Sequence, residues 1–141
     1  MLHLQFEVST GADLSADAKR DFVAWVTERY AEAMDTTMGH IAVTIREADE
    51  ASLALGRASE NEPVVVLNAD IRAGRSADQR WAFAEGVISE LDARFSVPAS
   101  NIYVIYTEHP GLDFHLAEGP LESWNPGDDP EGDAGANDPD I

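Results

Sequence analysis

The chain has 141 residues, which suffices for one well-buried hydrophobic core and is short for two independent domains. Its 27 acidic and nine basic residues give a formal net charge of −18 at pH 7, so we expect no nucleic-acid partner, because such a chain repels phosphate. The absence of cysteine excludes disulfides and thiolate chemistry, and the lack of a long apolar run or a signal-peptide pattern predicts a cytoplasmic protein without a membrane partner.

The first half of the chain has the pattern strand, helix, strand. A strand is predicted at about 2–8, where apolar and polar residues alternate, and another at about 41–47. Between them a helix is predicted from Ser15 to about 34, and a short helix is predicted at 50–57 on the connection to the second half. The apolar face of the long helix carries Phe22, Val23, Val26, Tyr30, Ala33 and Met34.

The second half repeats this pattern, with strands at about 64–71 and 102–107 and a helix at about 76–95 between them. Ser76 and Gln79 form a predicted capping box at the start of the helix, and Ser15 holds the corresponding place in the first half. Steps of three and four residues predict the buried stripe of this helix as Trp81, Ala84, Ile88, Leu91 and Phe95.

Two tandem βαβ units predict an α+β fold of the α/β-sandwich type, with a mixed four-stranded sheet and both helices on one face. The predicted domain spans 1–124, with repeats at about 1–62 and 63–124. The opposite face of the sheet is left uncovered, so we predict a homo-oligomer, specifically a trimer. Residues 125–141 are rich in Pro, Gly, Asp and Asn and are predicted to be a flexible acidic tail.

The charge also predicts a habitat. Among the nine basic residues only Lys19 is a lysine, and such a balance suits a cytoplasm that contains molar salt. A Debye length of about 3 Å at 1 M salt removes the self-repulsion of an acidic chain. We therefore predict a halophilic source, in which case the charge says little about a partner.

The segment 71–76 carries the clearest chemical signal. Arg72 and Arg75 lie where a buried strand meets the first turn of a helix, whose N-terminus is already positive. Together they predict a site for a small carboxylate. Pairing of both arginines with surface acids is the alternative. No metal is expected, because the four histidines lack helical ligand spacing with carboxylates; they are His3, His40, His109 and His115. The chain also lacks the glycine pattern of a phosphate-binding loop, and we expect no cofactor.

Two segments resemble a known family. The run Asp-Ile-Arg-Ala-Gly-Arg-Ser-Ala-Asp at 70–78 and the run Asn-Ile-Tyr-Val-Ile-Tyr-Thr-Glu-His-Pro at 101–110 resemble the cis-3-chloroacrylic acid dehalogenase group of the tautomerase superfamily. The resemblance covers about 1–124. It implies a trimer with a pocket at the start of the first strand, beside Leu2. It further implies that Arg72 and Arg75 bind small 2-keto, enol or unsaturated carboxylates.

The sequence departs from that family at its catalytic positions. The family uses an N-terminal proline, whereas this chain begins Met1-Leu2, and Pro63 holds its nitrogen in a peptide bond. Tyr30 stands where the family has a histidine, and Tyr103 lies near the place of its tyrosine, which is occupied by Ile105. The family's glutamate falls at Leu116, or at Glu118 if one residue is inserted. We therefore do not expect hydration-type dehalogenation.

Three functions stay open at this point. The first is a tautomerase in which the α-amine of Met1 transfers the proton, since two nearby guanidinium groups would disfavour its protonated form. Its predicted catalytic residues are Met1, Tyr30, Tyr103 and Glu118. The second is a carboxylate-binding protein without turnover, and the third is a structural trimer whose arginines join subunits through Glu108 or Glu118.

Overall fold

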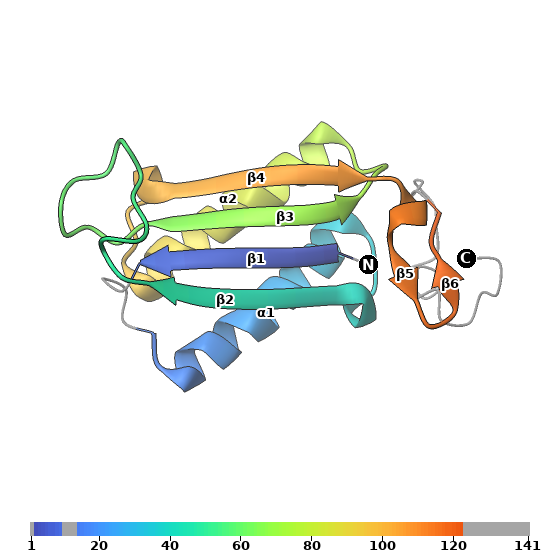
Figure 1. Cartoon of the computed structure of the whole chain (residues 1–141), viewed down its shortest axis with the longest axis horizontal. Coiled ribbons are helices and arrows are strands. Elements are labelled where there is room, and N and C mark those ends of the chain that lie inside the picture. The colour runs from blue at the N-terminus through green and yellow to red at the C-terminus, as the bar shows by residue number, and fades with distance from the viewer. Residues whose placement is uncertain (1, 10–13, 123–141) are drawn as a thin grey trace.

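A computed structural model describes residues 2–9 and 14–122 of the chain. The first repeat consists of β1 (Leu2–Ser9), α1 (Ala16–Met34) and β2 (Ile41–Ala48), and the second of β3 (Val65–Arg72), α2 (Ala77–Phe95) and β4 (Ile102–His109). The sheet order is β2-β1-β3-β4, with β1 antiparallel to β3 and the other neighbours parallel. Both helices cover the same face of the sheet (Figure 1), so the predicted fold is confirmed.

The two repeats match element by element. Each has an eight-residue strand, a 19-residue helix, a three-residue 3-10 turn and a second eight-residue strand. The side chains of Ser15 and Ser76 cap the two helices, and the predicted capping box with Gln79 is present. Asp35 and Ser96 end the helices in the left-handed conformation. The internal repeat thus extends from the strands to the caps.

The core lies between the sheet and the helices. Alternate side chains of β1 and β3 point to the helices, and the two strands have the same pattern of burial. Phe22 of α1 contacts Phe6 of β1 and Phe95 of α2, with ring centroids 5.2 and 5.7 Å apart. Tyr30 packs edge-on against Phe83 at 5.0 Å and joins the two helices.

The predicted stripe of α2 is partly wrong. Trp81 is 67% exposed, whereas Phe83 and Val87 are fully buried together with Ala84 and Leu91. The helix carries two neighbouring apolar rows. The row with Phe83 faces α1, because the ring of Phe83 packs against Tyr30 there. The row of Trp81 borders a groove of about 360 Å³ between α2 and β4. Periodicity shows that apolar rows exist and leaves open which row is inside.

The short helix predicted at 50–57 is also wrong, because these residues form turns. Eight residues that include Gly56 are few for a stable helix, because the first helical turn is costly to form and glycine disfavours it.

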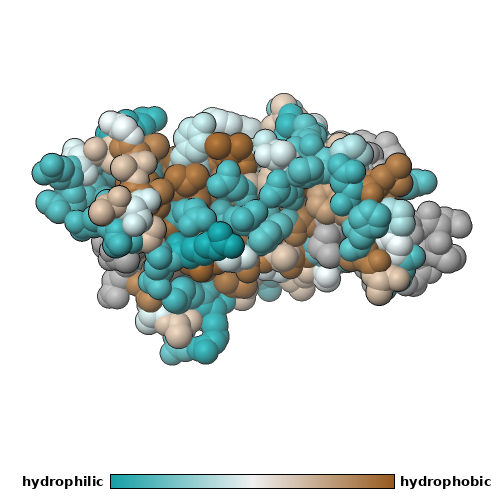
Figure 2. Space-filling view, viewed as in Figure 1, coloured by the Kyte–Doolittle hydropathy of each residue, from teal (hydrophilic) through white to brown (hydrophobic). Residues whose placement is uncertain are grey.

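The second face of the sheet carries no helix. Figure 2 views this face and shows hydrophilic and hydrophobic side chains side by side. Tyr103 and Ile105 of β4 are among the exposed apolar side chains. Beyond β4 come the short strands β5 (His115–Leu116) and β6 (Gly119–Pro120), which pair with each other. Within the described ranges, no helix is long and apolar enough to cross a membrane.

Tyr106 on the helix side of β4 supplies a test of this packing. Its hydroxyl donates a hydrogen bond to the carbonyl oxygen of Arg80 at 2.7 Å. Burial and the neighbouring Tyr30 raise the pKa of Tyr106, while Arg80 lowers it by less. The unfolded chain therefore releases this proton first, so stability is full below pH 10 and falls as the pH rises above it.

We expect ionisation of Tyr106 to lower the free energy of unfolding by up to about 1.4 kcal/mol per pH unit above pH 10. Tyr106→Phe is expected to remove this contribution to the pH dependence. Urea unfolding at pH 8.5 and pH 11 measures it. Tyr103→Phe changes an exposed tyrosine of the same strand and is the matched control. Equal pH dependence in wild type and Tyr106→Phe would contradict the packing of the phenol.

Candidate active site at the start of β1

Three strand ends meet at one end of the sheet. Because β1 runs antiparallel to β3 and β3 runs parallel to β4, the start of β1 lies beside the ends of β3 and β4. Leu2, Arg72 and His109 are therefore terminal residues of three neighbouring strands. The β5–β6 hairpin lies just beyond this end (Figure 1).

Both predicted arginines are buried here. Arg72 is 5% exposed and Arg75 is 6% exposed, which is unusual for arginine in any protein. The Nε–H of Arg75 donates to the carbonyl oxygen of Met34 at 3.1 Å. Met34 is the last residue of α1, where the helix dipole is negative and carbonyl groups lack partners within the helix. Arg75 thus also supports the end of α1, a role that the sequence did not reveal.

The other predicted site residues divide into two groups. Leu2 is buried at the same end as the arginines, and Glu118 is exposed in the turn of the β5–β6 hairpin. Tyr30 is fully buried in the core, away from solvent. Tyr103 lies six residues before His109 on β4, a separation of about 20 Å along the strand. Met1 lies outside the described residues, as does the predicted tail at 125–141.

The structure adds a polar network that the sequence did not predict. Asp70 Oδ1 lies 2.9 Å from His109 Nε2, and Asp70 Oδ2 accepts a hydrogen bond from Gln5 Nε2 at 3.1 Å. His3 Nε2 lies 2.6 Å from the hydroxyl of Thr44 on β2. These two separate groups of contacts together involve residues of all four strands on the face without helices. The residues of each pair are far apart in sequence, so only the strand register shows that they meet.

Within the described part of the chain, no group of three histidine or acidic side chains is arranged to hold a metal ion.

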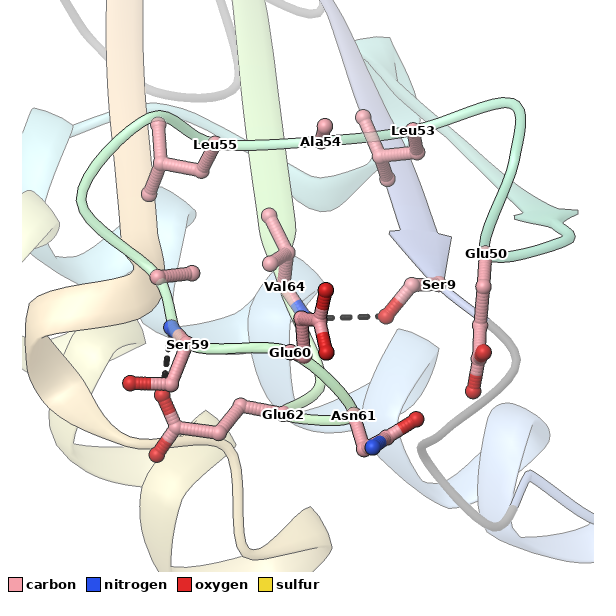
Figure 3. Close-up of a pocket in the computed structure, with 11 residues that line it drawn as sticks. Ser9, Glu50, Leu53, Ala54, Leu55, Ser59, Glu60, Asn61, Glu62 and Val64 are labelled. Carbon is pink, nitrogen blue, oxygen red and sulfur yellow. Dashed lines mark hydrogen bonds between the residues drawn. The ribbon is translucent and has the colours of Figure 1, made fainter.

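A cavity of about 340 Å³ lies at the opposite end of the sheet (Figure 3). Three carboxylates line it, from Glu50, Glu60 and Glu62, together with apolar side chains such as Leu53. The backbone N–H of Ser59 and the amide of Asn101 donate to Glu62 and lower its pKa, so this carboxylate is ionised at neutral pH. Such a cavity repels a carboxylate ligand, which leaves the arginine end as the candidate site.

No protein-family model matches this sequence, and neither does any curated protein. Solved structures match it closely in fold. A symmetric trimer described as W0 fused 4-OT superimposes with a TM-score of 0.74 at 18% identity, covering 84% of this chain and 97% of that one. N1, a member of the cis-3-chloroacrylic acid dehalogenase family, gives a TM-score of 0.70 at 24% identity, covering 87% of this chain and 85% of that one.

A macrophage migration inhibitory factor-like protein from Entamoeba histolytica gives a TM-score of 0.72 at 13% identity, covering 85% of this chain and 98% of that one. These proteins share a fold with the chain at low sequence identity. The chain therefore has the fold of the tautomerase superfamily, and the resemblance seen in its sequence is confirmed at that level.

Proposed function

We propose that this protein is a tautomerase that acts on a small 2-keto, enol or unsaturated carboxylate. The observation that carries the proposal is the pair of buried arginines beside the start of β1 in a tautomerase fold. Arg72 and Arg75 bind the carboxylate and stabilise the negative charge that develops on the substrate oxygen. The primary α-amine of Met1 takes the place of the proline and exchanges the proton at carbon.

The protein acts as a homotrimer in this proposal. Two fused 4-OT proteins with the same fold are symmetric trimers. The sheet leaves one face without helices, and Tyr103 is exposed there at the end remote from Arg72. A neighbouring subunit can bring its Tyr103 or Glu118 to the arginines, which one chain alone cannot do for Tyr103. Tyr30 is a packing residue in this scheme, because it is fully buried.

The test measures tautomerisation of phenylenolpyruvate in molar potassium chloride. Arg75→Ala is expected to lower kcat/KM by about 10- to 150-fold, the loss of a charge-assisted hydrogen bond worth about 1.5–3 kcal/mol. An N-terminally acetylated form is expected to lose rate as well. Arg94→Ala, which removes an arginine paired with Glu90 at the far end of α2, is the control and should keep the rate. No rate above buffer from a trimer would rule out a tautomerase of this substrate class.

A protein without turnover is the second candidate, and the bond from Arg75 to the Met34 carbonyl favours it, because the arginine then has a structural role. A carboxylate-binding protein would bind phenylpyruvate in an Arg75-dependent way with no rate. In a structural trimer, Arg75→Ala would dissociate the subunits, which sedimentation detects.

A further inference from the structure

The open face of the sheet holds an acid–base pair next to the proposed carboxylate site. His109 is the last residue of β4, and Asp70 lies two residues before the end of β3. The distance between His109 Nε2 and Asp70 Oδ1 is 2.9 Å. Each side chain is about one third exposed in the single chain. The contact joins residues 39 positions apart in sequence.

The pair is held firmly on both sides. The amide of Gln5 donates to the second oxygen of Asp70, which leaves the carboxylate one favourable orientation toward His109. The ring of Phe114 packs edge-on against the imidazole with 5.6 Å between centroids. The backbone N–H of Ala73 donates to the carbonyl oxygen of His109 at 2.8 Å and fixes the strand ends to each other.

The imidazole is adjacent to Arg72. The two residues are direct partners in the parallel register of β3 and β4, and neighbouring strands lie about 4.8 Å apart. Arg72 lies two residues after Asp70 on β3, and side chains two positions apart on a strand point to the same face. The side chain of Arg72 therefore leaves the strand on the face that carries the pair. Among the residues described, no hydrogen bond involves the second ring nitrogen, Nδ1 of His109.

We propose that His109, oriented by Asp70, is a catalytic acid–base residue for the carboxylate substrate held at Arg72. This inference rests on the proposed function and assigns it a second proton-transfer group besides the α-amine. A carboxylate that holds one imidazole nitrogen fixes the tautomer and leaves the other nitrogen for proton transfer. Asp70 is the positioning residue of the pair.

The step balances without a further reactant. Nδ1 of His109 takes the hydroxyl proton of the enol, and the C–O bond becomes a carbonyl. The electron pair of the C2–C3 double bond forms a new C–H bond at C3 with a proton from the α-ammonium group. The substrate loses one proton at oxygen and gains one at carbon, and solvent exchange restores both protein groups. A single amine can act first as the base and then as the acid, whereas the pair lets two separate groups serve the oxygen and the carbon of the substrate.

The test measures kcat and KM for phenylenolpyruvate in molar potassium chloride. His109→Gln is expected to lower kcat by about 10²- to 10⁴-fold with little change in KM, as for the loss of a general acid–base group. Asp70→Asn is expected to lower kcat in the same way, and the double variant to be no slower than His109→Gln, since the two residues act as a unit. His115→Gln, which changes an exposed histidine of β5, is the matched control.

The outcomes separate this inference from the proposed function. A wild type without any rate overturns both. If acetylation of the N-terminus abolishes the rate while His109→Gln and Asp70→Asn keep their kcat, the proposed function stands and the inference is wrong. A purely structural pair would lower the urea midpoint and leave kcat unchanged. If His109→Gln does not assemble into a trimer, the kcat and KM of Asp70→Asn, which preserves the shape of the acid, test the inference instead.

Discussion

Phe83→Ala is expected to lower the free energy of unfolding by about 3–5 kcal/mol, the usual cost of removing a fully buried phenylalanine. Phe83 is fully buried and its ring meets Tyr30 at 5.0 Å, so the substitution opens a cavity between α1 and α2. The pair of edge-on rings is lost as well. Urea unfolding followed by circular dichroism in molar potassium chloride measures the change at fixed protein concentration.

Trp81→Ala is the matched control, because Trp81 lies two residues earlier on the same helix and is 67% exposed. Substitutions at exposed positions usually change stability by about 0.5 kcal/mol or less. If Trp81→Ala costs as much as Phe83→Ala, the helix is rotated relative to its described position. The comparison also decides between the apolar row expected from the sequence and the row that the structure buries.

The fold was predictable because its signals are local. The signals for each strand and helix lie within that element, for example the apolar–polar alternation in β1 and the capping box at Ser76. The predicted element boundaries therefore agree with those of the structure within about two residues. The rotation of α2 was not predictable in this way. Two apolar rows lie side by side on it, and only the position of Tyr30 on α1 decides that Phe83 is inside.

The candidate site was predictable only where one segment carries it. Arg72 and Arg75 lie three residues apart at a strand end, and that local pattern pointed to this end of the sheet. The contact of Arg75 with Met34 spans 41 residues and depends on how α1 ends beside the loop. The pairing of His109 with Asp70 depends on the register of β3 with β4, which the sequence does not state. Tyr103 shows the reverse case, since a residue chosen by resemblance lies far from Arg72 within one chain.

Gly111→Ala is expected to release the segment that follows β6. Gly111 begins a 3-10 turn, Gly111–Asp113, and a Cβ added there would run into the backbone carbonyl group of Glu122. Backbone cannot swing aside as a flexible side chain can, so this overpacking should cost about 1–3 kcal/mol. The segment is otherwise well anchored, because Leu121 is fully buried and its N–H donates to the Phe114 carbonyl oxygen at 3.1 Å.

Hydrogen exchange at Leu121 and the binding of phenylpyruvate measure the consequence. The β5–β6 hairpin that precedes Glu122 lies beyond the start of β1, and Phe114 packs against the imidazole of His109. Release of the segment after β6 should therefore loosen the imidazole and weaken the binding of the carboxylate at the same time. Gly56→Ala is the control, because nothing lies within 4 Å of the added Cβ. Unchanged exchange at Leu121 in Gly111→Ala would show that this segment does not pack on the turn. Faster exchange with unchanged binding would instead separate the hairpin from the site and leave Arg72 and Arg75 to bind the carboxylate without it.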